Sequence, residues 1–162
     1  MTRVVLFIAL FPFCAATLSA RLGETEKELI ARFGRPLSRS SEATFAQGRR
    51  IEIGARLTFR NEDWSIESVI VEGRCVREGY RKVGDWTEEQ ISTVLSSNAQ
   101  GAKWTEFTKP GTRTIARDWK REDGAVAVWR LGSMTVIHPA FERAMAIALS
   151  KAKAASAKPA KI

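Results

Sequence analysis

The chain has 162 residues, a formal net charge of +8, and 44% hydrophobic and 27% charged side chains. This hydrophobic content is that of an ordinary globular protein. No glycine-rich phosphate loop and no Gly-x-Ser-x-Gly motif occurs, so two common classes of enzyme motif are missing.

The first twenty residues have the layout of a secretory signal. Arg3 is the only charge before the apolar run Val4–Ala20, which ends in small residues. A membrane-spanning helix needs roughly 20 apolar residues, and this run is shorter and contains Pro12. We therefore predict a signal peptide over residues 1–20 and an exported protein, periplasmic or extracellular. The alternatives are an uncleaved N-terminal anchor, cleavage after Ala16 rather than Ala20, and a lipoprotein signal at Cys14.

Removal of this signal leaves about 140 residues, enough for one domain that buries roughly two-thirds of its surface. We assign that domain to residues 21–150. Cys14 leaves with the signal, so Cys75 cannot form an internal disulfide. We interpret Cys75 as a small buried residue at the end of a strand. The alternative is a thiol made reactive by the neighbouring Arg74 and Arg77.

Most of the positive charge lies outside this domain. Residues 21–150 contain 21 basic and 18 acidic side chains, which leaves only +3. The Ala/Lys-rich end of the chain adds Lys151, Lys153, Lys158 and Lys161. We predict that residues 155–162 form a disordered tail that aids solubility. A contact with anionic envelope polymers or lipid headgroups is the alternative.

Three segments carry helix signals. Capping boxes at Thr25–Glu28 and Thr87–Gln90 begin two predicted helices, because each threonine hydroxyl can accept a hydrogen bond from a backbone N–H group in the first turn. The first helix ends at Gly34 and the second between residues 98 and 101. A third helix is predicted over residues 140–154, after a proline and with apolar residues on one side.

Between the helices, the pattern indicates antiparallel strands. Apolar and polar residues alternate from Arg50 to Arg60, which predicts a half-buried strand with Ile51 through Phe59 on its apolar face. A turn at residues 61–63 precedes a returning strand over Trp64–Glu72. Further strands are predicted over residues 103–108, 112–120, 125–131 and 134–138.

This order of elements predicts the α+β class, with helices on one face of an antiparallel sheet. Residues 22–82 and 83–138 both run from a helix start into strands. We interpret the two halves as a tandem repeat of a helix-plus-hairpin unit, followed by the C-terminal helix.

The start of the domain resembles a known family. Leu22–Thr25, followed by Leu29–Pro36, is similar to the opening of SmpA/OmlA-type envelope domains, in which a Gly-x-Thr helix start leads to a Gly-x-Pro helix end. The tandem layout also resembles the β-lactamase inhibitor protein architecture, and the whole chain resembles small exported bacterial proteins. These resemblances imply a periplasmic binding or assembly role. The literal match covers about fifteen residues. The chain differs from the SmpA/OmlA lipoproteins in having no lipobox and from the inhibitor in having no disulfides. The resemblance assigns no ligand-contact residue to this chain.

No catalytic constellation is predicted. His138 is the only histidine and precedes the last helix, where a polar residue commonly caps the helix start. A general base is the alternative role for His138. One histidine and one mature cysteine are too few for a usual zinc site. We therefore predict no catalytic residues, no metal and no cofactor.

Basic side chains give the candidate binding surface. Arg50, Arg56 and Arg60 are predicted on one face of one strand, and a second group crowds the connection between the two halves. Together they could bind an anionic partner. The alternative is a solvated sheet face balanced by glutamates. The second group consists of Arg74, Arg77, Arg81 and Lys82.

The tryptophans are interpreted as core or edge residues, with Trp119 and Trp129 meeting across one hairpin. Export makes nucleic acid a poor partner, and the tail is too polar for stable membrane insertion.

The sequence thus predicts an exported, non-enzymatic binding module of the bacterial cell envelope, whose partner is an envelope protein or an anionic envelope polymer. An inhibitor or accessory subunit of an envelope enzyme is the first alternative, and a small hydrolase of unknown type is the second.

Overall fold

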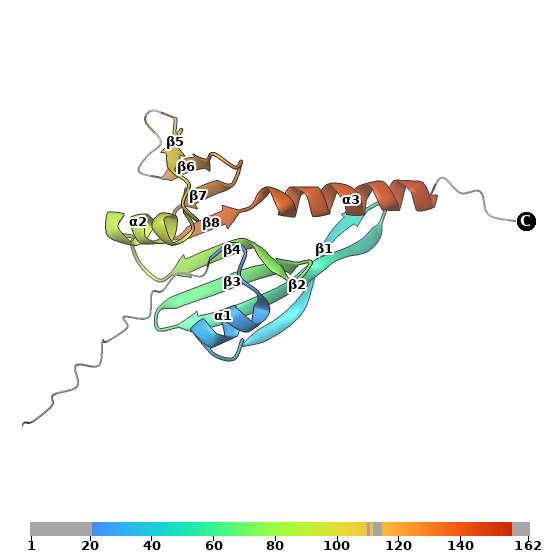
Figure 1. The fold of residues 1–162 in the computed structure, drawn as a ribbon, viewed down its shortest axis with the longest axis horizontal. Helices are drawn as coiled ribbons and strands as arrows, with labels where there is room; N and C mark the ends of the chain where they lie inside the picture. The colour runs from blue at the N-terminus through green and yellow to red at the C-terminus, as the bar shows by residue number, and fades with distance from the viewer. Residues whose placement is uncertain (1–20, 110, 112–114, 157–162) are drawn as a thin grey trace, which may run out of the picture.

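The computed structural model describes residues 21–109, 111 and 115–156 (Figure 1). The signal peptide predicted over residues 1–20 lies outside this range. So do residues 157–162 of the predicted tail and residues 112–114 at the start of one predicted strand.

The described chain contains one antiparallel sheet with strand order β1-β2-β3-β4-β8-β7-β6-β5. Three helices accompany it, so the predicted α+β class with an antiparallel sheet is confirmed. Its strands are β1 (Ser38–Ala46), β2 (Arg49–Asn61), β3 (Trp64–Val71), β4 (Arg74–Lys82), β5 (Trp104–Glu106), β6 (Ala116–Arg121), β7 (Val126–Arg130) and β8 (Ser133–Ile137).

The helices are α1 (Glu26–Phe33), α2 (Glu88–Ser97) and α3 (Pro139–Ser156). Both predicted capping boxes are present, at Thr25 and at Thr87, with reciprocal side-chain and backbone hydrogen bonds. Helix α3 continues two residues into the predicted tail.

The larger core lies on one face of the sheet, under α1 and α2. Leu29 of α1 and Val94 of α2 pack with a cross-strand row that runs from β2 to β7. Directly opposed residues of antiparallel strands share a face, and this row consists of Phe59, Ile66, Tyr80, Met134 and Trp129. We call this side of the sheet the core face.

Helix α3 lies on the opposite side, which we call the α3 face. Its residues Ala140, Phe141 and Ala144 pack against Val69 and neighbouring valines of β3 and β4. Figure 1 shows α3 running toward the hairpin formed by β1 and β2. Helices α1 and α2 therefore share one face, whereas α3 covers part of the other, so the prediction that the helices lie on one face holds for two of the three.

The two halves of the chain have the same order of elements. In each, one helix precedes an antiparallel meander of four strands, and β4 pairs with β8 to join the meanders. The predicted unit contained a hairpin rather than four strands. That the halves are a true repeat stays a prediction.

Two strands were not predicted. The segment Arg74–Lys82, interpreted from the sequence as a connection between the halves, is β4 and lies inside the sheet. Its alternating burial was obscured by five charged residues, which occur on both sides of the strand. Strand β1 is an edge strand made mostly of small and polar residues, which gives no clear hydrophobic alternation.

A β-bulge divides β2 between the two faces. Glu42 pairs with Gly54, whereas the next residue, Ala43, pairs with Glu52, so Ile53 is the extra residue. After this shift Leu57 and Phe59 enter the core face, while Ile51 and Ile53 lie beside α3. The prediction that Ile51 through Phe59 share one face is therefore wrong.

Gly54 is required at this bulge because the neighbouring strand comes very close. A Cβ atom on Gly54 would lie 2.1 Å from the carbonyl oxygen of Ile70, a distance that backbone atoms cannot accept. We predict that Gly54→Ala lowers the free energy of unfolding by about 2 kcal/mol, measured by urea denaturation. Gly79→Ala is the matched control, since its Cβ would meet nothing closer than 3.8 Å. Equal losses for the two variants would contradict this account.

Candidate functional site

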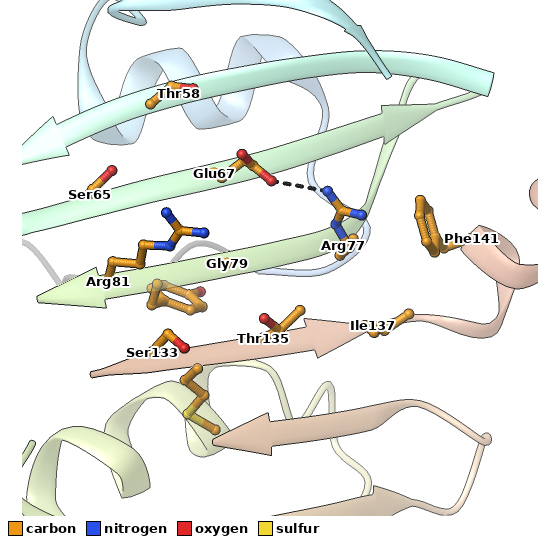
Figure 2. A pocket seen from close by; sticks show the side chains of 12 residues that line it. Thr58, Ser65, Glu67, Arg77, Gly79, Arg81, Ser133, Thr135, Ile137 and Phe141 are labelled. Atoms are coloured by element: carbon orange, nitrogen blue, oxygen red, sulfur yellow. Dashed lines mark hydrogen bonds and ion pairs between the residues drawn. The ribbon is translucent and has the colours of Figure 1, made fainter. Parts of the chain in front are cut away.

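A hollow of about 330 Å³ lies on the part of the α3 face that α3 leaves open. Figure 2 shows its side chains coming from β2, β3, β4 and β8, with Phe141 of α3 at one end. Four hydroxyl side chains line it, together with Glu67, Arg77 and Arg81. Those hydroxyls belong to Thr58, Ser65, Ser133 and Thr135.

The sheet register orders these residues into rows across the strands. One row alternates arginine and serine over five neighbouring strands, from β2 to β7. We call it the arginine–serine row, and it consists of Arg60, Ser65, Arg81, Ser133 and Arg130. Because neighbouring strands are about 4.8 Å apart, successive arginines are spaced by roughly 10 Å.

The next row forms the floor of the hollow. Gly79 lies in its centre, between Glu67 of β3 and Thr135 of β8, and Thr58 continues the row on β2. Since Gly79 has no side chain, nothing from β4 fills the hollow at this position, next to Arg81 along the strand.

Two of the predicted arginines are neutralised by a closed ion-pair network. Arg77 contacts Glu67 at 3.0 Å and Glu42 at 3.2 Å, and Arg56 contacts the same two glutamates. Arg77 also lies over the Phe141 ring, 4.8 Å from its centroid. The hydrogen bond to Glu42 raises the pKa of Arg56 above its usual value. This network joins α3 to the sheet and leaves no net charge for a ligand.

Arg60 and Arg81 keep their full charge. Both side chains are exposed, and neither has a hydrogen bond or ion pair within the described residues. Arg130, at the other end of the row, donates to Asp118 at 2.8 Å, and its side chain is 49% exposed. The arginine–serine row therefore has two uncompensated guanidinium groups and a third that is held in place.

The other predicted site residues do not join this surface. The bulge places Arg50 on the core-face side of the hairpin, where it contacts Ser41 and Glu52, so the prediction that it shares a face with Arg56 and Arg60 is wrong. Arg74 donates to the carbonyl oxygen of Gly23. Lys82 also points to the core-face side, with its Nζ atom 5.9 Å from the centroid of the Trp64 ring.

Sequence reasoning missed the members contributed by β8 and β7. Ser133, Thr135 and Arg130 reach the site only because β8 pairs with β4 across the two halves. The local pattern of these residues does not specify that pairing. The returning strand Trp64–Glu72 was predicted, however, and its alternation would have placed Ser65 and Glu67 together.

The interpretation of the tryptophans as core or edge residues agrees with their burial. Trp64, Trp119 and Trp129 are buried, and Trp104 packs against the core. Trp119 pairs with Ala127 and Trp129 with Arg117, so the two indoles are not directly opposed across their hairpin.

His138 acts structurally at the start of α3. Its Nδ1 atom accepts a hydrogen bond from the backbone N–H of Ala140, as expected of a capping side chain. Burial lowers the pKa of His138, although the nearby Asp123 opposes this shift.

Cys75 is 1% exposed and belongs to the large core, in agreement with its interpretation as a small buried residue. It lies near the start of β4 rather than at the end of a strand. Burial raises the pKa of its thiol well above the usual value. The arginines beside it in the sequence do not activate it.

The core also contains a buried carboxyl group. Glu78 is fully buried and accepts hydrogen bonds from the Tyr80 hydroxyl and from the Cys75 thiol, at 3.4 Å from Sγ. Asn98 links this group to the N-terminal segment by accepting the Leu22 N–H and donating to the Tyr80 oxygen. Burial raises the pKa of Glu78 to about 7.

Comparison with protein-family models, with curated proteins and with solved structures found no match to this chain. The resemblance to SmpA/OmlA-type domains and to the inhibitor architecture therefore stays a prediction.

Two further observations concern the described residues alone. No group of three or more histidine, cysteine, aspartate or glutamate side chains there is arranged to hold a metal ion. Among the helices of the same part of the chain, none is long and apolar enough to span a membrane.

The raised pKa of Glu78 predicts a specific pH dependence of stability. In the folded protein this carboxyl group keeps its proton up to about pH 7, whereas in the unfolded chain it loses it near the ordinary value of 4.5. The free energy of unfolding therefore falls by roughly 3 kcal/mol as the pH rises from 4.5 through 7.

Urea denaturation at several pH values measures this slope of the free energy of unfolding against pH. The Glu78→Gln variant loses the slope, whereas Glu122→Gln, at an exposed turn, keeps it. A Glu78→Gln variant with the parent slope would show that another group titrates.

The buried thiol predicts slow alkylation. With iodoacetamide, the peptide that contains Cys75 stays unlabelled in the native protein and is labelled completely in urea, as quantified by mass spectrometry. Rapid labelling under native conditions would instead support the reactive-thiol alternative.

Proposed function

We propose that the chain is an exported, non-enzymatic binding module of the bacterial cell envelope, and that the hollow on the α3 face binds an anionic ligand. The observation that carries this proposal is the pair of uncompensated guanidinium groups of Arg60 and Arg81 beside hydroxyl side chains. Guanidinium groups form strong, charge-assisted hydrogen bonds with carboxylates, sulfates and phosphates.

The surroundings of the hollow support binding rather than catalysis. Glu67, the carboxylate that lines it, is engaged by Arg77 and Arg56, so it is poorly suited to act as a general base. Cys75 belongs to the opposite core, and His138 does not line this hollow.

The position of the charge also supports an electrostatic mode of binding. Arg60 and Arg81 lie on exposed strand positions, where attraction to an anion is screened by salt. We therefore expect an affinity that decreases as the ionic strength rises.

Binding to soluble polygalacturonate, polyphosphate and neutral dextran tests this function by isothermal titration calorimetry. We predict that at least one of the two polyanions binds at low salt, that its affinity falls at higher salt, and that dextran does not bind. Arg81→Gln lowers the affinity about fivefold, the loss expected when one exposed charged hydrogen bond is removed.

The matched control is Arg50→Gln, which changes the net charge equally but lies on the other face. It leaves the affinity within about twofold of the parent. A chain ending at Ser156 separates the site from the basic tail, and it keeps the parent affinity. An affinity that does not change with ionic strength, or equal losses of affinity in the Arg50 and Arg81 variants, would contradict the proposed function.

A further inference from the structure

We infer that the ligand of the α3 face is a linear acidic polysaccharide that lies across the strands along the arginine–serine row. This inference rests on the proposed function and adds to it the chemical class and the direction of the ligand.

The row is long enough for a polymer. It crosses four neighbouring strand pairs, from Arg60 on β2 to Arg130 on β7, with Arg81 midway on β4. At about 4.8 Å for each pair, this row spans roughly 19 Å. A single small anion would contact one arginine and leave the other two unused.

The alternation of arginine and serine favours a ligand whose anionic groups are widely spaced. Between successive arginines stands a serine, Ser65 or Ser133, whose hydroxyl can donate to and accept from neutral hydroxyl groups. A matching chain therefore has anionic groups about 10 Å apart, separated by neutral hydroxyl-bearing units. A polysaccharide that contains uronic acids has both kinds of group.

The neighbouring row restricts where the anionic groups can lie. In that row Glu67 and Asp118 are already paired with arginines and offer an anion no favourable contact, whereas Thr58 and Thr135 offer hydroxyls. The carboxylates of the ligand are thus directed to the arginine–serine row and its neutral hydroxyls to the row beside it. A densely charged chain such as polyphosphate would place further negative charges against this neighbouring row, which contains no basic side chain.

The depth at Gly79 provides space for a sugar ring. Its Cβ position is open, with the nearest atom 3.8 Å away, so the hollow deepens beside Arg81. Phe141 and Ile137 form an apolar end of the hollow, toward α3 (Figure 2). One ring seated over Gly79 would place its carboxylate at Arg81.

A length series of oligosaccharides in which a uronic acid alternates with a neutral sugar, from the uronic acid monosaccharide upward, tests the inference with the full chain. We expect the affinity to rise with length and to level off once the oligomer spans about 19 Å. Arg60→Gln and Arg130→Gln each lower the affinity for long oligomers about threefold to fivefold and change that for the monosaccharide less than twofold, because only long oligomers reach the ends of the row. Arg81→Gln weakens both.

A second measurement needs no variant and so does not depend on the folding of one. Phenylglyoxal modifies exposed arginines, and mass spectrometry locates the modified sites. Long oligomers protect Arg60, Arg81 and Arg130 together, whereas the monosaccharide protects Arg81 alone. Arg50, whose side chain is 47% exposed against 49% for Arg130, is the internal control and stays modified.

A steric variant separates the shape of the hollow from its charge. Gly79→Val fills the floor without altering any charge and weakens the binding of oligomers at constant salt dependence. Unchanged affinity in this variant would overturn the placement of the ring over Gly79.

The outcomes distinguish this inference from the proposed function. If the monosaccharide binds as tightly as long oligomers, or polyphosphate binds more tightly than the alternating oligomers, the polysaccharide inference is wrong and the anion-binding function stands. If neither polyanion binds, the proposed function itself fails.

Discussion

The pairing of β4 with β8 is the interaction on which the rest of the structure depends. It joins the meander of the first half to that of the second and makes one continuous sheet. Strand β4 alternates between two environments. Glu78 and Tyr80 enter the core face, while Arg77, Gly79 and Arg81 form part of the opposite surface. Any shift of one residue in this register would bury arginines and expose the core.

The bulge at Ile53 is the second constraint, because it allows one strand to serve two cores. Beyond the bulge, Leu57 and Phe59 pack under α1, and before it Ile51 and Ile53 lie beside α3. An unbulged strand with the same sequence would put all four on one side. Helix α3 would then lose Ile51 and Ile53 as neighbours of Ile147 and Ala148, and would keep only its packing on the valines of β3 and β4.

Local signals in the sequence were sufficient for the helices and for most strands. Capping boxes are local, and they located the starts of α1 and α2 because the hydrogen bonds that define them join residues three apart. Strand β4 could not be found in this way. It has a polar side that bears Arg77 and Arg81, and its core side contains Glu78, so its hydrophobic alternation is broken on both sides.

The candidate site was predictable only in part, for a related reason. Four of the predicted basic residues, Arg56, Arg60, Arg77 and Arg81, lie on one face of the sheet, but the sequence does not show which of them are neutralised. Glu42 neutralises Arg56 and Arg77 from the edge strand β1, which was not predicted, and the bulge removes Arg50. The serines and Arg130 depend on pairing between halves that are distant in the chain.

On the α3 face, paired charges hold the structure together in one region, and unpaired charges are available to a ligand in another. Near α3, two arginines and two glutamates form a network that is partly buried, where unpaired charges would be costly. Farther from α3, water can solvate Arg60 and Arg81, so they remain unpaired without a large penalty. The row that includes them takes residues from both halves of the chain. A ligand that spans the row would therefore bind only the joined sheet, and its binding energy would add to the stability of the junction between β4 and β8.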